Sequence, residues 1–195
     1  RPTALGARRV PGPGQPVGTR EADRVDEPAP TPNQLGLHHL DVPLGELMIT
    51  MDFAPFFHAW EFKGRFPQLL DDPRQGEAAR SLWSDGQAIL HRILDEKRLQ
   101  AKACYAIYPA SAQGETVSLE TPGGIERFEF LRQQRGKKPT CLADYIADRD
   151  DHMGIFWVTA GIGLDELVNE YESQGDTYSA LLAKAWADRF AESLA

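Results

Sequence analysis

The sequence is poor in cysteine and in positive charge, and it has no long uninterrupted apolar run. Two cysteines, Cys104 and Cys141, are too few for a disulfide framework and lack the C-x-x-C spacing of zinc or iron–sulfur sites. A formal net charge of −8 repels the phosphate backbones of nucleic acids. The longest apolar stretch, residues 153–164, is about half the length of a membrane helix. These absences predict a globular cytoplasmic protein that binds neither nucleic acid nor membrane.

Proline is concentrated at the start of the chain. Seven of the fourteen prolines lie in residues 1–34, where large apolar side chains are nearly absent. Such a segment cannot bury enough surface to offset its ordering entropy. We expect residues 1–34 to be a linker or extended arm and residues 35–195 to form the folded part. Because the chain begins with Arg1 and not Met, we also expect it to be a fragment of a longer protein.

The apolar spacing predicts helices at both ends of the folded part. Residues 72–99 have apolar side chains at spacings of three, four and seven, which is typical of a helix with one buried face. Pro55 suits the first turn of a short helix whose apolar face would include Phe56, Phe57 and Trp60. The other expected helices are residues 42–51 with Asp41 as the cap, 164–171, and 176–195 with Tyr178, Leu181, Leu182, Ala185, Trp186, Phe190 and Leu194 as the apolar face.

The period changes to two in the middle of the chain. Strands are expected at residues 103–109, 117–119 and 125–131, separated by turn-like segments at 111–114 and 121–124. Three short strands joined by turns predict an antiparallel meander. A fourth strand, 154–159, is apolar throughout and is therefore expected to be central. The fold class is α+β, with a twisted antiparallel sheet flanked by helices.

Several motifs have ordinary structural explanations. Gly161-Ile162-Gly163 lies between a strand and a helix, as in a nucleotide-binding loop, but Glu166 stands where the third glycine would be. His38-His39 with Asp41 does not have the spacing of a metal site, and the acidic run Asp148, Asp150 and Asp151 lacks the alternation of a calcium loop. No catalytic residue and no metal ligand is predicted.

Two acidic residues are weighed as ligand-binding residues. Asp52 precedes a cluster of aromatic side chains, where an acid is placed to meet a cation or hydroxyl groups against an apolar wall. Its alternative role is to cap the Pro55 helix. Glu192 lies on the last helix, and its alternative role is that of an exposed acid near Arg189. The residues alone favour these alternative roles.

Blocks from residue 35 to residue 195 resemble, in order and spacing, the activation domain of cobalamin-dependent methionine synthase. The first block, Met-Asp-Phe-Ala-Pro-Phe-Phe at residues 51–57, is similar to the family's Ile-Asp-Trp-Thr-Pro-Phe-Phe. The others are Gly-Arg-Phe-Pro at 64–67, Tyr-Pro-Ala at 108–110, Leu-Arg-Gln-Gln at 131–134, Cys-Leu-Ala-Asp-Tyr at 141–145, Gly-Ile-Phe-Trp-Val-Thr-Ala-Gly at 154–161, Asp-Thr-Tyr at 176–178 and Lys-Ala-Trp-Ala-Asp-Arg-Phe-Ala-Glu at 184–192.

The resemblance implies a function. Methionine synthase is a methyltransferase that moves a methyl group from methyltetrahydrofolate to homocysteine through cobalamin. When the cobalamin oxidises to cob(II)alamin, the activation domain presents S-adenosylmethionine (AdoMet), and an electron from a flavodoxin-like protein or flavoprotein reductase helps to restore methylcobalamin. Asp52 and Glu192 match the family's AdoMet-binding acids. Cobalamin would be held mainly by another domain of the enzyme, and zinc only by a part that this chain does not contain.

The chain departs from the family pattern in ways that bear on the site. Phe53 replaces the usual Trp, and Glu115-Thr116 replaces an Asp-Asp pair. The family continues past the last helix to an Arg-x-x-x-Gly-Tyr segment that helps to hold AdoMet, so we expect the domain to be truncated at its C-terminus and inactive alone. Two alternatives follow: a stand-alone or degenerate module that caps a corrinoid protein without binding AdoMet, and a Rossmann-type methyltransferase that uses the Gly161 loop.

Overall fold

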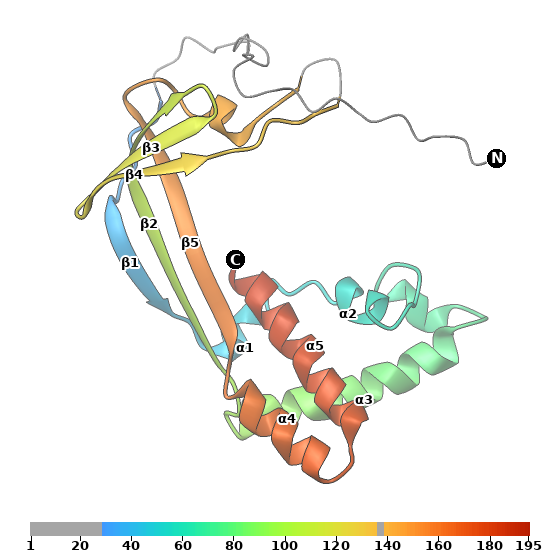
Figure 1. Ribbon diagram of the computed structural model, residues 1–195. Helices are drawn as coiled ribbons and strands as arrows, with labels where there is room; N and C mark the ends of the chain where they lie inside the picture. The colour runs from blue at the N-terminus through green and yellow to red at the C-terminus, as the bar shows by residue number, and fades with distance from the viewer. Residues whose placement is uncertain (1–28, 136–138) are drawn as a thin grey trace, which may run out of the picture. The chain divides into compact units, whose positions relative to one another are not determined.

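The computed structural model describes residues 29–135 and 139–195, which fall into two compact units (Figure 1). Unit 1 is Arg1–Asn33 with Tyr108–Met153, and unit 2 is Gln34–Ile107 with Gly154–Ala195. Most of the expected linker, residues 1–28, lies outside the described residues, so the boundary near residue 35 stays a prediction.

Unit 2 contains the helices, which are α1 (Leu44–Leu47), α2 (Ala54–His58), α3 (Gly76–Asp95), α4 (Leu164–Ser173) and α5 (Thr177–Leu194), with a 3-10 turn at Gln68–Asp71. The helices predicted around residues 72–99, 164–171 and 176–195 are confirmed. Helix α3 starts later than expected because Asp72 accepts hydrogen bonds from the backbone N–H groups of Arg74 and Gln75 before the helix begins. These hydrogen bonds lower the pKa of Asp72.

An aromatic cluster forms the core of unit 2 where α2, α3 and α5 meet. Phe56, Phe57 and Trp186 are fully buried, and the rings of Phe56 and Trp186 stack with centroids 4.7 Å apart. The indole N–H of Trp186 donates a hydrogen bond of 2.8 Å to the carbonyl oxygen of Gly86 on α3. Because buried aromatic rings contribute large apolar areas, this cluster fixes α5 against the other two helices.

The buried face of α5 differs in part from the prediction. Leu182, Trp186 and Phe190 are buried as expected, but Tyr178 is 40% exposed and Leu181 is 51% exposed. Tyr178 instead packs against Trp60 and donates a hydrogen bond of 3.0 Å to Asp85. Asp176 caps the helix by accepting a hydrogen bond from the backbone N–H of Ser179. Hydrogen bonding by the side chain of Ser179, and then by its backbone, lowers the pKa of the Asp176 carboxyl.

The region before α2 was predicted incorrectly in two respects. Residues 36–41 form strand β1 (Gly36–Asp41), so Asp41 lies at the end of a strand and does not cap a helix. Helix α1 covers only Leu44–Leu47: Pro43 precedes it without any side-chain cap, and turns follow it at residues 48–50. Strand β1 depends on antiparallel pairing with β2, a long-range contact that local periodicity does not reveal.

The other strands are β2 (Gln100–Gln113), β3 (Thr116–Thr121), β4 (Gly124–Glu129) and β5 (Asp151–Ile162). Hydrogen bonding orders them β1-β2-β3-β4, with β5 paired to β2. The predicted antiparallel meander is confirmed, since β2 pairs with β3 and β3 with β4 in antiparallel register. The expected turn at residues 111–114 was wrong, because β2 continues to Gln113 and only the next two residues turn.

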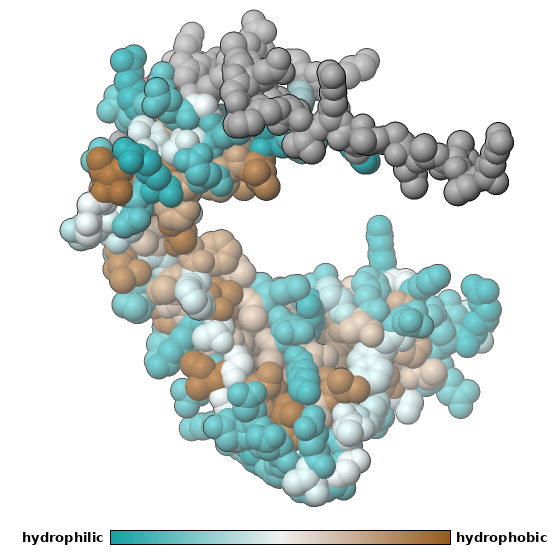
Figure 2. Space-filling view, viewed as in Figure 1, coloured by the Kyte–Doolittle hydropathy of each residue, from teal (hydrophilic) through white to brown (hydrophobic). Residues whose placement is uncertain are grey.

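Strand β5 is not buried along its apolar middle, contrary to the prediction of a central strand. Its pairing partner is β2, and Ile155, Phe156 and Trp157 are 40%, 61% and 75% exposed. In the face shown in Figure 2, apolar side chains are exposed over strands as well as over helices. Apolar composition alone therefore did not determine the burial of this strand.

The Gly161 loop is a tight strand-to-helix turn. Gly163 precedes α4 with φ of +91°, and a Cβ atom there would lie 2.3 Å from the carbonyl oxygen of Arg98. Helix α4 is followed directly by α5, so residues 164–195, all of which are described, contain no strand that would complete a βαβ unit. These observations exclude the Rossmann-type alternative.

Unit 1 has a small core of its own beneath the meander. Its buried residues are Ala110, Ala112, Val117, Leu119, Cys141 and Ala143. Arg132 joins the segments around this core: it forms two hydrogen bonds, 2.7 and 2.8 Å long, with Asp144 and a third with Glu115. These carboxylates raise the pKa of the Arg132 guanidinium, so its positive charge is permanent.

Candidate functional site

Asp52 lies between the turn that ends the α1 region and the start of α2. Its side chain is exposed, and Oδ1 accepts a hydrogen bond of 2.9 Å from the backbone N–H of Ala54, the first residue of α2. The N-cap position of α2 is Phe53 and has no side-chain cap, so the predicted cap was one residue off, although Asp52 does bind the first N–H of the helix. An ionised carboxylate has about four lone-pair sites, so one backbone contact leaves room for a ligand.

The residues that follow Asp52 anchor it to the aromatic cluster. Phe53 contacts Trp83 and Trp186 edge-on, with ring centroids 5.3 and 6.2 Å apart. Met51, on the other side of Asp52, is 8% exposed. Because both neighbours of Asp52 pack into the core, its backbone is fixed while its carboxylate reaches solvent.

Glu192 lies on the last turn of α5, with its side chain 65% exposed. Both of its carboxylate oxygens accept hydrogen bonds from Arg189, at 2.7 and 2.9 Å. The predicted proximity to Arg189 is thus a bidentate ion pair. The buried residues Trp186 and Phe190 lie on another face of the same helix and hold α5 in place.

Hydrogen bonds join the segments that carry the two acids. Ser193, next to Glu192, donates a hydrogen bond of 2.7 Å to the carbonyl oxygen of Leu47, and its Oγ lies 2.8 Å from Oγ1 of Thr50. Thr50 is two residues before Asp52. The structure therefore brings the neighbourhoods of Asp52 and Glu192 together, although 143 positions separate Thr50 from Ser193 in the sequence.

Sequence reasoning missed Ser193 and Thr50. Neither hydroxyl belongs to a motif, and a serine near the end of a helix has no sequence signal that distinguishes a long-range contact from an exposed side chain. The contact forms because the fold places α1 beside α5.

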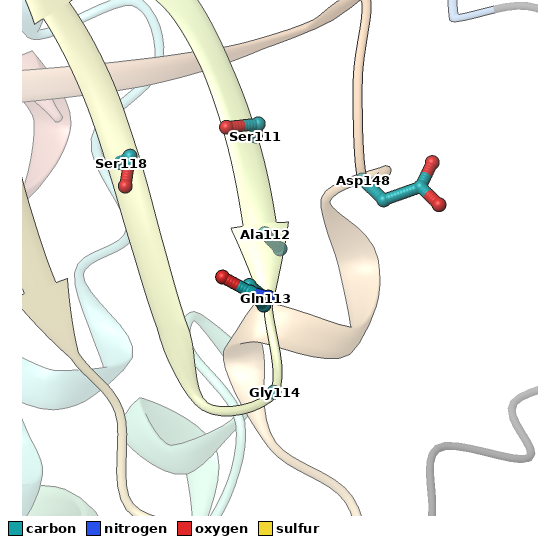
Figure 3. A pocket seen from close by; sticks show the side chains of 6 residues that line it. All are labelled: Ser111, Ala112, Gln113, Gly114, Ser118 and Asp148. Carbon is teal, nitrogen blue, oxygen red and sulfur yellow. The ribbon is translucent and has the colours of Figure 1, made fainter.

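Each unit also has an open pocket, but neither pocket is lined by Asp52 or Glu192. The unit 2 pocket, about 630 Å³, lies between the start of α1 and the end of α3 and includes Leu44, Ile93 and Lys97. The unit 1 pocket, about 470 Å³, lies beside the turn between β2 and β3, with the hydroxyl groups of Ser111 and Ser118 on adjacent strands (Figure 3). Both acids are exposed and lie outside these two pockets.

The motifs for which the sequence favoured ordinary structural roles can also be placed in the structure. Among residues 29–135 and 139–195 no group of three or more His, Cys, Asp or Glu side chains is placed to hold a metal ion. His38 stacks on Tyr105 with centroids 4.9 Å apart, so this histidine has a packing role within the sheet. Both cysteines are free thiols. None of the described helices has the length and hydropathy needed to cross a membrane.

Together, the helices and the antiparallel sheet define an α+β domain in which hydrogen bonds join the segments that carry Asp52 and Glu192. The family model for the activation domain of vitamin B12 dependent methionine synthase matches residues 43–195. The chain belongs to this family.

A solved structure supports the same assignment. It is described as the MetH reactivation domain bound to AdoHcy, and it matches this chain with a TM-score of 0.80 and 30% sequence identity. The match covers 86% of this chain and 55% of the solved chain, so this chain spans about half the length of that domain. The predicted fold class is confirmed.

Proposed function

We propose that the chain binds AdoMet at a site that includes Asp52 and Glu192, and that it serves the reductive remethylation of cob(II)alamin in a cobalamin-dependent methionine synthase. The observation that supports this most directly is the hydrogen bonding of Ser193 to Leu47 and Thr50, which brings both acid-bearing segments together. A relative of the same fold is described as bound to AdoHcy, the demethylated form of AdoMet.

The chemistry of the two acids suits this ligand. AdoMet carries an ammonium group, a sulfonium group and ribose hydroxyls, all of which interact favourably with carboxylates. Asp52 and Glu192 are exposed, so a ligand can reach them without moving a core residue. The rigid aromatic cluster behind Asp52 provides the fixed backbone that a binding group needs.

In this proposal the domain contributes binding and orientation. Methyl transfer to cobalt requires the sulfonium methyl group to be held close to the corrin, and positioning of this kind lowers the barrier by removing translational and rotational freedom. The cobalamin-binding domain of the same enzyme is the proposed partner, together with a flavodoxin-like or flavoprotein electron donor. The enzyme is a methyltransferase of methionine biosynthesis in the cytoplasm.

Calorimetric titration with AdoMet tests the proposal. It is carried out on this chain and on the natural polypeptide with any residues that follow Ala195. Asp52→Asn removes the charge but keeps an oxygen that can accept the hydrogen bond from Ala54, so the start of α2 keeps this contact. Loss of a charged hydrogen bond costs about 1.5–3 kcal/mol, which raises Kd by roughly 10- to 150-fold.

A matched control distinguishes the site from a general charge effect. Glu172→Gln removes an exposed carboxylate on α4 that pairs with Lys184, and it should leave AdoMet binding unchanged. If the natural polypeptide does not bind AdoMet, or if Asp52→Asn binds it as well as the unmodified protein does, the proposal fails. The domain would then be a module that caps a corrinoid protein without binding AdoMet.

A further inference from the structure

The ion pair between Arg189 and Glu192 has an asymmetric environment. The side chain of Arg189 is 11% exposed, whereas that of Glu192 is 65% exposed. The two contacts run from separate guanidinium nitrogens to separate carboxylate oxygens, at 2.7 and 2.9 Å. Arginine is therefore the fixed half of the pair, and it presents the glutamate to solvent in one orientation.

The surroundings of the pair restrict it further. Arg189 lies between the buried residues Trp186 and Phe190 in the sequence of α5, which are both 0% exposed. Ser193 ties the end of the helix to the α1 region. The backbone that carries both members of the pair is thus held on either side of it.

The pair also changes the charge that a ligand meets. A carboxylate whose two oxygens face a guanidinium group has a net charge close to zero when viewed from several ångströms away. It still has unused lone pairs, so it remains a hydrogen-bond acceptor. Glu192 is therefore suited to hold an N–H or O–H group, and poorly suited to attract a sulfonium charge at longer range.

We propose that Arg189 is a positioning residue of the AdoMet site. It orients the carboxylate of Glu192 through two hydrogen bonds and neutralises its charge, so that Glu192 binds as an acceptor and not as a counter-ion. Glu192 consequently contributes little to discrimination between AdoMet, with its sulfonium cation, and AdoHcy, whose sulfur is neutral. This inference rests on the proposed function, and the solved relative described as bound to AdoHcy is consistent with it.

Two single variants and their double variant, each of which changes the charge of the pair, test the proposal. The quantity measured is the ratio of the two dissociation constants, Kd(AdoHcy)/Kd(AdoMet), at low ionic strength on the natural polypeptide. Arg189→Gln leaves an unpaired negative charge and should raise the ratio. Glu192→Gln leaves an unpaired positive charge and should lower it. The double variant is again neutral and should return the ratio to that of the unmodified protein. Each single variant should change the ratio about two- to fivefold, as expected for one screened unit charge near the ligand.

Two further variants separate charge from geometry. Arg189→Lys keeps the charge but loses the bidentate contact, so both ligands should bind more weakly with an unchanged ratio. Lys184→Gln removes one positive charge from an exposed pair elsewhere on α5, and it should change neither affinity. Thermal unfolding of each variant verifies that the fold is retained.

The outcomes distinguish this inference from the proposed function. If the unmodified polypeptide binds neither ligand, the proposed function fails and the role of Arg189 fails with it. If it binds both ligands but Arg189→Gln weakens them equally, Arg189 has only a structural role and this inference is overturned. If Arg189→Gln has no effect on either ligand, the ion pair is irrelevant to the site.

Discussion

Replacement of Gly86 by alanine tests the packing that holds the Asp52 segment. Gly86 lies in the middle of α3, where alanine ordinarily stabilises a helix by about 1 kcal/mol relative to glycine. Here a Cβ atom would lie 2.6 Å from Cζ of Phe56, with the two neighbouring ring carbons at 3.3 and 3.5 Å. Carbon atoms in contact are normally about 3.5–4.0 Å apart, so the ring would have to move by about 1 Å.

Phe56 has little freedom to move. It is 1% exposed, it stacks on Trp186, and its ring meets Phe57 and Trp83 edge-on. Overpacking of this kind costs about 1–3 kcal/mol, which exceeds the gain in helix propensity. We therefore expect Gly86→Ala to lower the free energy of unfolding by up to about 2 kcal/mol and to weaken AdoMet binding, because Phe56 and Asp52 share one short segment.

Urea unfolding followed by circular dichroism measures the effect, with Gly45→Ala as the matched control. Gly45 is also helical, but nothing lies within 4 Å of a Cβ atom there, so this variant should be as stable as the unmodified protein or more so, by up to about 1 kcal/mol. If Gly86→Ala is as stable as Gly45→Ala, Phe56 is not held as described, and the account of the core is wrong.

Two further predictions concern pH. Hydrogen bonds from Arg92 and Arg98 lower the pKa of Glu170 below its ordinary value of 4.5, so the stability that this carboxylate contributes is present above pH 4.5 and is lost as the pH falls. Glu170→Gln should be less stable than the unmodified protein at pH 7, and chemical unfolding should show this difference shrinking toward pH 3; a constant difference would contradict the ion-pair explanation. Burial and Asp85 raise the pKa of Tyr178 from 10.0 to about 12, so its contribution is full below pH 10 and is lost between these values. Unfolding midpoints of Tyr178→Phe should fall less steeply than those of the unmodified protein over this range, and parallel curves would contradict the shift.

The long helices were predictable because their signals are local. In α3 and α5 the apolar side chains repeat with the helical period, and Asp176 is a side-chain cap that can be read from the sequence. The meander was predictable for a related reason, since a glycine-containing turn separates β3 from β4. Each of these features depends on residues within a few positions of one another.

The failures arose where distant contacts decide the outcome. Strand β1 exists through pairing with β2, in the register that places His38 beside Tyr105. The apolar middle of β5 suggested burial, yet Trp157 is 75% exposed. The apolar composition of a segment can indicate a strand, but whether that strand is buried depends on the elements that pack against it.

The candidate site also combines features that the sequence indicated with features that depend on distant contacts. Asp52 and Glu192 were singled out by resemblance to a family, and the residues alone favoured ordinary roles for them. The Ser193–Thr50 contact that brings their segments together and the bidentate geometry of Arg189 required the structure. No spacing rule relates positions 143 residues apart.

The central claim is that a ligand of the AdoMet type binds at the junction of the Asp52 segment and the end of α5. The most direct test is a nitrogen-15 NMR titration of the natural polypeptide with AdoHcy, with the amide signals assigned residue by residue. The account predicts that the largest shifts occur at Asp52, Ala54, Glu192 and Ser193. Shifts that are absent there, or that are confined to the unit 1 pocket beside Ser111 and Ser118, would contradict it.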